Sequence, residues 1–224
     1  MSNPIINVVA LISGRGTNLQ AIIDQTQSGQ LPIKLCAVIS DNPDAQGLLR
    51  AEAAGIPAQR VVRKDYESRN LFEQALIRSI DSHQPDLVLL AGFMRVLSNA
   101  FVEHYAGRLM NIHPSLLPAY PGLNTHARAL ADDTRQHGAT VHFVTDQVDA
   151  GPVIIQATVP VKADDSAETL AARVLEQEHR IYPQAIRWFA EQKLQIVDNK
   201  VLLEGQQQSQ QGLVTHSRPI RASD

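Results

Sequence analysis

The sequence has a single cysteine, Cys36, among its 224 residues, so no intramolecular disulfide can form and a disulfide-stabilised mini-protein is excluded. The sequence also has no large excess of charge of one sign, because 20 basic and 23 acidic residues give a formal net charge of −3. This balance provides no global attraction to nucleic acid or to acidic membranes. The apolar run near the N-terminus is short, is broken by Asn7 and has no basic residues before it, which predicts neither a signal peptide nor a membrane span. We therefore expect a globular protein of the reducing cytoplasm, without nucleic-acid or membrane partners.

Apolar material is plentiful, since hydrophobic residues make up 44% of the chain and charged residues 19%. At roughly 150 residues per domain, the length allows one or two domains. Nothing typical of a linker interrupts residues 1–204, which we interpret as one domain, whereas residues 205–224 are rich in Gln, Ser and Arg and predict a flexible tail. Cys36 lies in an apolar run and is expected to be a small buried core residue.

Short apolar runs alternate with segments of helical spacing in the first 92 residues. Strands are expected at residues 6–12, 34–40, 58–62 and 87–92, and helices after the glycine turn at residues 14–18, at 46–54 and at 65–82. Such alternation is typical of an α/β fold, and strands that are apolar throughout indicate burial on both faces. The sequence therefore predicts a mostly parallel open sheet with helices on both faces.

The second half of the chain has a different pattern. Residues 109–124 contain three prolines, which exclude a helix and predict a strand that runs into a long ordered loop. The runs 139–146 and 153–161 lie on either side of Gly151–Pro152 and predict an antiparallel pair. Helices are expected at 125–133 and at 165–192, the second capped at Ser166 and kinked or split by Pro183, and a hairpin at 195–204.

The turn Gly14–Asn18 is the first candidate site. Glycines between a strand and a helix let backbone N–H groups approach an anion, and the helix N-terminus adds its partial positive charge, so a phosphate group is the preferred ligand. A dinucleotide fingerprint fits poorly because Leu19 stands where its third glycine belongs, and the Walker Gly-Lys-Ser/Thr motif is absent. Asp41, at the end of the second strand, keeps a dinucleotide-dependent oxidoreductase open as an alternative. A non-catalytic ligand sensor and a plain tight turn stay open as well.

Asn111 and His113 form the second candidate site, at the end of an apolar strand. Side chains two residues apart in a strand point the same way, so an amide and an imidazole face one pocket and can hold an oxyanion and move a proton. Asp146 and Asp149 follow a later strand, and either can stabilise an imidazolium if the fold brings it to His113. The simpler interpretations are a structural histidine and turn-forming aspartates.

The remaining polar clusters are less specific. Glu176-Gln177-Glu178-His179 is most simply the solvated face of a helix. The eight histidines include no His-x3-His pair and there is only one cysteine, so no metal site is expected. The residues alone thus indicate an enzyme that acts on a phosphorylated small molecule with an Asn/His/Asp set, and they do not identify the reaction.

Five segments that occur in order carry a resemblance to a known family. They are LISGRGTNLQAIID, LAGFMRVLS, NIHPSLLPAYPG, HGATVHFVTDQVDAGPVI and QEHRIYP, and the match extends from about residue 6 to about residue 204. With them the chain resembles the phosphoribosylglycinamide formyltransferases, the folate-dependent glycinamide ribonucleotide transformylases of purine biosynthesis. The resemblance implies a Rossmann-like formyltransferase fold and transfer of the formyl group of 10-formyltetrahydrofolate to the terminal amine of glycinamide ribonucleotide. A formyltetrahydrofolate hydrolase is the alternative within this fold.

The resemblance also implies roles for individual residues. It assigns catalysis to Asn111, His113 and Asp149, and it implies a phosphate-binding N-terminal half and a folate-binding, catalytic C-terminal half. Binding of the ribonucleotide falls to Gly16, Thr17, Asn18 and Glu178. Binding of the folate falls to Arg69, Met94, Arg95, Val96, Leu97, Asn111, Thr145, Asp146, Gln147, Val148 and Asp149.

The implied reaction is direct transfer without a metal, in which the amine attacks the formyl carbon and Asn111 and protonated His113 hold the oxyanion. The implied partners are the two small-molecule substrates, and we expect a monomer or a weak homodimer. Four positions depart from the family pattern: Arg15, Thr17 and Ala119 replace commoner residues, with Thr17 keeping the hydroxyl of the commoner serine, and Asn124 stands where a histidine is common.

Overall fold

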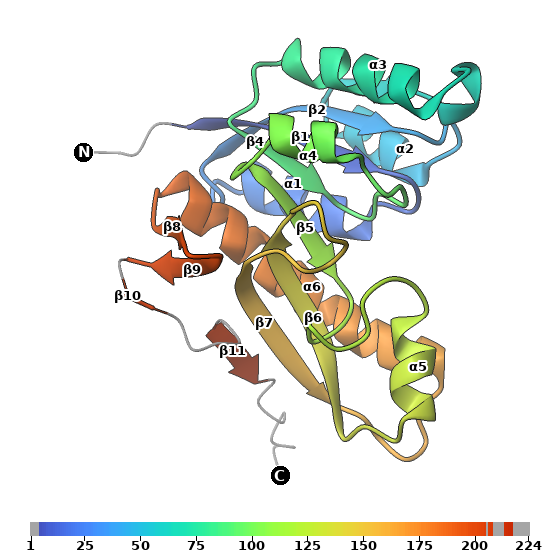
Figure 1. Cartoon of the computed structure of the whole chain (residues 1–224), viewed down its shortest axis with the longest axis vertical. Helices are drawn as coiled ribbons and strands as arrows, with labels where there is room; N and C mark the ends of the chain where they lie inside the picture. Colours follow the sequence, from blue (N-terminus) through green and yellow to red (C-terminus); the bar gives the residue numbers. More distant parts are fainter. Residues whose placement is uncertain (1–4, 205, 208–212, 217–224) are drawn as a thin grey trace.

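A central sheet of eight strands runs through the computed structural model, which describes residues 5–204, 206–207 and 213–216 (Figure 1). Its strand order is β11-β7-β6-β5-β4-β1-β2-β3, and β8, β9 and β10 form a separate three-stranded sheet. The strands of the large sheet are β1 Ile6–Ile12, β2 Ile33–Ser40, β3 Ala58–Arg60, β4 Leu87–Leu90, β5 Leu109–His113, β6 Gln136–Phe143, β7 Val153–Pro160 and β11 Leu213–His216. The small sheet consists of β8 Leu194–Val197, β9 Lys200–Leu203 and β10 Gln206–Gln207.

Of the strands described in the large sheet, only β6 runs opposite to the others, because β11 is parallel to β7. Strands β3, β2, β1, β4 and β5 are parallel, β6 is antiparallel to β5, and β7 is antiparallel to β6. The predicted mostly parallel sheet with antiparallel strands toward the C-terminus is therefore confirmed. The hairpin expected at 195–204 is formed by β8 and β9.

Helices cover both faces of the sheet. They are α1 Thr17–Gln27, α2 Gln46–Ala53, α3 Arg69–Asp81, α4 Asn99–His104, α5 Thr125–Ala131 and α6 Ala167–Ala190, with a 3-10 turn, η1, at Arg63–Asp65. Alternate side chains of β1 enter two separate cores. Val8 and Ala10 pack with residues of α1, α2 and α6, and Val9 and Leu11 pack with residues of α3 and α4. None of the described helices is long and apolar enough to cross a membrane.

Helix α6 is one continuous helix that includes Pro183, so the expected split of this segment is wrong. A proline within a helix costs roughly 3 kcal/mol or more. Burial on both sides of the proline offsets that cost, because Ile181, Tyr182, Ala185 and Ile186 are all buried against the sheet. The Tyr182 hydroxyl also donates to the carbonyls of Leu90 at 3.0 Å and Met110 at 3.1 Å, which ties α6 to β4 and β5. The expected cap is confirmed as a capping box of Ser166 and Thr169.

Cys36 is only partly buried, which corrects the expectation of a buried core residue. The register between β1 and β2 shifts at this point, since Val8 pairs with Leu35 and Val9 pairs with Ala37. Cys36 is the unpaired residue of this irregularity. Such a bulge disrupts the alternation of inward and outward side chains, and the sequence gives no sign of it.

Two further segments differ from the sequence expectation. Helix α3 begins at Arg69, because the Ser68 hydroxyl accepts a hydrogen bond from the Leu71 N–H, and η1 occupies part of the helix expected at 65–82. Helix α4 was not expected, although Ser98 caps it in the same way. Within residues 205–224, β10 pairs with β9 and β11 pairs with β7. The remainder of that segment lies outside the described residues, and its flexibility stays a prediction.

Candidate active site

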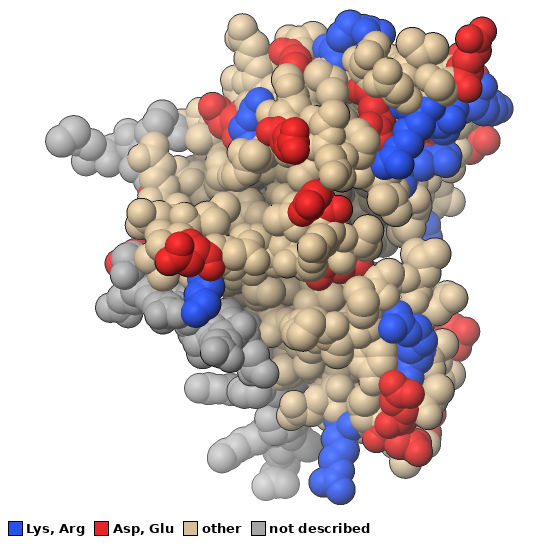
Figure 2. Space-filling model, viewed as in Figure 1, with Lys and Arg blue, Asp and Glu red and all other residues tan. Residues whose placement is uncertain are grey.

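A cavity of about 310 Å³ opens at the carboxyl ends of β4 and β5, next to the point where the sheet becomes antiparallel. The loops that follow β4, β5 and β6 form its walls. Figure 2 shows that this face is indented between the upper and lower halves of the molecule, with Lys and Arg side chains gathered above the indentation. Ligands bind at this kind of place in open α/β sheets. The predicted residues that line the cavity are Met94, Arg95, Val96, Leu97, Asn111, His113, Thr145, Asp146, Val148 and Asp149.

His113 is the last residue of β5, and only 7% of its side chain is exposed. Its Nε2 lies 2.9 Å from the carbonyl oxygen of Tyr120, a contact that requires the proton on Nε2. Its Nδ1 faces the cavity and lies 3.4 Å from Oδ2 of Asp149. Proton transfer is therefore left to Nδ1, and the Asp149 carboxylate is placed to stabilise the imidazolium.

Asp149 lies in the loop after β6 and has a backbone φ of 54°, a left-handed conformation that aspartate tolerates better than most residues. The Gly122 N–H donates to its Oδ2 at 2.8 Å. This bond joins the loop after β5 to the loop after β6 across the cavity. The carboxylate, 10% exposed, is thereby held against His113.

His142 is a site residue that the sequence analysis missed. Its Nδ1 lies 2.9 Å from the carbonyl oxygen of Phe143, so Nδ1 carries the proton, and its Nε2 accepts from Nδ2 of Asn111 at 3.2 Å. Burial lowers the pKa of His142, which favours this neutral form. One N–H of Asn111 is thus used to fix the amide, and its second N–H remains for a ligand.

Two of the residues assigned to folate binding do not line the cavity. Gln147 lies in the loop after β6 and is not among the residues that line the cavity. Arg69 is the first residue of α3, and its guanidinium donates through Nη2 to the Val96 carbonyl at 2.8 Å and through Nε to Glu73 at 2.8 Å. Arg69 therefore holds the segment Met94–Leu97 through the Val96 carbonyl and does not itself line the cavity.

The second predicted site, the glycine turn, lies between β1 and α1. Gly16 has a φ of 68°, in the left-handed region that favours glycine, and α1 begins directly after it at Thr17. The buried Asn18 donates through Nδ2 to Glu178 of α6 at 2.6 Å, although the two residues are 160 positions apart. This bond brings Glu178 to the turn that contains Gly16, Thr17 and Asn18, and because Glu178 is buried it does not belong to a solvated helix face.

Asp41 is not available to a ribose. It is 4% exposed, and both of its carboxylate oxygens accept hydrogen bonds within the protein, from Ser13 Oγ and from Arg95 Nε, each at 2.5 Å. Leu19 is fully buried in the core. Both observations argue against the dinucleotide alternative. Among the described residues, no group of three or more His, Cys, Asp or Glu side chains is placed to hold a metal ion.

Replacing Glu178 with glutamine is expected to stabilise the fold increasingly as the pH rises. Burial raises the pKa of Glu178, and the Asn18 hydrogen bond only partly opposes this effect. The ionised carboxylate is therefore destabilising in the folded state above its unfolded pKa, and glutamine, which can still accept from Asn18, avoids that cost. Denaturant unfolding of both proteins between pH 4 and pH 8 would measure the difference. A constant difference across this range would contradict the assignment.

Comparisons with known proteins agree with this geometry. The family model described as formyl transferase matches residues 6–186. A phosphoribosylglycinamide formyltransferase of Escherichia coli (strain K12) is 53% identical over 207 residues, which make up 92% of this chain and 98% of the relative. The solved phosphoribosylglycinamide formyltransferase of Coxiella burnetii is 50% identical, with a TM-score of 0.90 over 94% of this chain and 99% of that one. A formyltetrahydrofolate deformylase of Pseudomonas putida KT2440 is more distant, with 27% identity and a TM-score of 0.82 over 91% of this chain and 71% of that one.

Proposed function

The chain belongs to the formyl transferase family, as one of the phosphoribosylglycinamide formyltransferases, and from this premise we propose where its two substrates bind and which residues act on them. Its activity is the formylation of glycinamide ribonucleotide in purine biosynthesis. The observation that carries the proposal is the convergence of Asn111, His113 and Asp149 in one cavity.

The formyl donor, 10-formyltetrahydrofolate, occupies the cavity at the ends of β4 and β5. The segment Met94–Leu97 and the loop Thr145–Asp149 lie on its walls, and its apolar lining suits the flat pteridine ring. The ribonucleotide phosphate binds at Gly16, Thr17 and Asn18, where backbone N–H groups and the start of α1 favour an anion. Glu178, which accepts from Asn18 of this turn, receives the glycinamide end, the role that the family resemblance implies for it.

The reaction follows from the placement of three groups. The terminal amine attacks the formyl carbon, a C–N bond forms, and the formyl oxygen becomes an oxyanion. The free N–H of Asn111 and the His113 imidazolium stabilise that charge. Asp149 stabilises the imidazolium and relays the amine proton, through water, toward the folate nitrogen that leaves when its C–N bond breaks. Proximity and oxyanion stabilisation provide the catalysis.

Hydrolysis of formyl-folate is the second candidate function, because a water molecule placed at the amine position would release formate. The similarity of the chain to a formyltetrahydrofolate deformylase, at 27% identity, is the reason to test for hydrolysis. The joined Asn18 and Glu178 argue against it, since water needs neither a phosphate loop nor a carboxylate that reaches that loop.

Absorbance assays with 10-formyl-5,8-dideazafolate, with and without glycinamide ribonucleotide, separate these functions. Transfer predicts deformylated product only when the ribonucleotide is present. Formate release at an equal rate without the ribonucleotide would support the hydrolase, and the absence of turnover from folded protein would contradict both. A monomer or weak homodimer, a cytoplasmic location and independence of metal stay predictions.

A further inference from the structure

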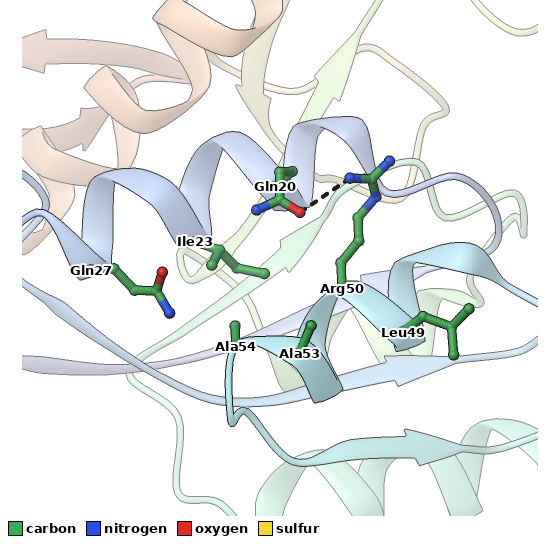
Figure 3. A pocket seen from close by; sticks show the side chains of 7 residues that line it. All are labelled: Gln20, Ile23, Gln27, Leu49, Arg50, Ala53 and Ala54. Carbon is green, nitrogen blue, oxygen red and sulfur yellow. Dashed lines mark hydrogen bonds between the residues drawn. The ribbon is translucent and has the colours of Figure 1, made fainter.

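Helix α2 lies against the glycine turn and contributes a side chain that reaches it. Figure 3 shows Arg50 extending from α2 toward Gln20 of α1, across a groove of about 390 Å³ between the two helices. The Arg50 guanidinium donates through Nε to the carbonyl of Arg15 at 2.8 Å and through Nη1 to Oε1 of Gln20 at 3.1 Å. One side chain therefore connects the glycine turn, the first turns of α1 and helix α2.

A second contact from α2 holds the same turn. The Gly47 N–H donates to the Gly14 carbonyl at 3.1 Å. The two backbones approach so closely that a Cβ added at Gly16 would lie 2.7 Å from the Gly47 Cα, and one added at Gly47 would meet the Ile12 side chain. Two successive carbonyls of the turn, those of Gly14 and Arg15, are thus anchored on α2.

These anchors set the direction of the neighbouring N–H groups. In a trans peptide the carbonyl and the N–H of the same plane point in opposite directions. With the carbonyls of Gly14 and Arg15 held on α2, the N–H groups of Arg15 and Gly16 point away from α2. Donors fixed in advance bind an anion more tightly, because less ordering is left to occur on binding.

We propose that Arg50 is a positioning residue for the phosphate of the ribonucleotide, which it serves by holding the Arg15–Gly16 peptide in its anion-binding orientation. This inference rests on the proposed function of the glycine turn. Arg50 acts on binding of one substrate and does not touch the formyl group. Its loss therefore weakens phosphate binding and leaves folate binding and the chemical step unchanged.

The test compares three variants with the wild-type enzyme. Arg50→Met is expected to raise KM for glycinamide ribonucleotide on the order of tenfold, the scale of a lost charge-assisted hydrogen bond, with kcat and KM for the formyl-folate unchanged within about twofold. Arg50→Lys keeps the charge and one donor, so it recovers part of the affinity. Gln20→Met removes the second hydrogen-bond partner of Arg50 without changing the charge, so it raises the same KM if Arg50 acts by position, whereas attraction by charge alone leaves that KM unchanged.

Direct binding supplies the second readout. The affinity for inorganic phosphate can be measured by titration, followed through the amide signals of Gly16 and Thr17 in 1H–15N spectra. We expect this affinity to fall in Arg50→Met by about the same factor as KM for the ribonucleotide rises. Arg78→Met, at an exposed position on α3, is the control for loss of an arginine. If Arg50→Met does not fold, Arg50→Lys and Gln20→Met decide the matter.

Unchanged KM and phosphate affinity in Arg50→Met would overturn the proposal, as would equal increases in KM for both substrates. Failure of the proposed function gives a different result, because the wild-type protein itself would then neither bind phosphate at the glycine turn nor use the ribonucleotide.

Discussion

Replacing His113 with alanine is expected to lower kcat for formyl transfer by at least about 10²-fold, the usual contribution of a positioned acid–base or oxyanion-stabilising group. The imidazole is almost completely buried, its Nδ1 faces the Asp149 carboxylate, and the cavity surrounds both. Loss of the ring removes both the cation that stabilises the oxyanion and Nδ1, the atom that exchanges the proton. Steady-state assays with both substrates would measure the change, mainly in kcat.

A second variant separates this role from a structural one. The Nε2 of His113 also holds the loop after β5 through the Tyr120 carbonyl. His113→Gln keeps an N–H donor near that position but provides no group that can be protonated. Equal losses in both variants indicate the proton role, whereas normal turnover in His113→Gln would reduce His113 to a loop anchor. His104→Ala, at a half-exposed histidine that pairs with Asp81, is the matched control.

Asp149→Asn is expected to reduce kcat by a similar factor, at least about 10²-fold, because it removes one charge and little else. Asparagine tolerates the positive φ of this residue, and its amide oxygen can still accept from the Gly122 N–H. The two loops therefore stay joined while the imidazolium loses its carboxylate. Rapid-quench single-turnover experiments would show whether the chemical step is the one that slows.

Two observations would contradict this assignment of Asp149. One is near-normal single-turnover chemistry in Asp149→Asn. The other is a rise in KM for the formyl-folate with an unchanged kcat, which would make Asp149 a binding residue. Asp44→Asn, at an exposed aspartate before α2, provides the matched control for loss of a carboxylate.

Much of the site follows from short-range patterns in the sequence. Residues 111 and 113 face one cavity because side chains alternate along a strand, and this holds wherever β5 lies in the sheet. The position of Gly16 before a helix follows in the same way from the local alternation of strand, turn and helix. Such features depend on neighbours in the chain, so the sequence predicts them well.

Features that depend on register between distant strands were not predictable. His142 meets Asn111 because β6 runs antiparallel to β5 with these two residues opposite each other. A shift of one residue would turn His142 to the other face, and the sequence of β6 alone does not fix the register. Cys36 was misplaced for a similar reason, since the irregularity between β1 and β2 is a property of the pair. Pro183 does not split α6, because tertiary burial outweighs its local cost.

The bond between Asn18 and Glu178 has a consequence for the synthesis of this chain. The two residues are 160 positions apart, so at roughly 5–20 residues per second the ribosome needs about 8–32 s after it makes Asn18 to supply its partner. During that interval the glycine turn exists without the helix that completes it. Ribonucleotide binding should therefore stabilise only the finished chain, and the metabolite would favour completed enzyme over nascent fragments.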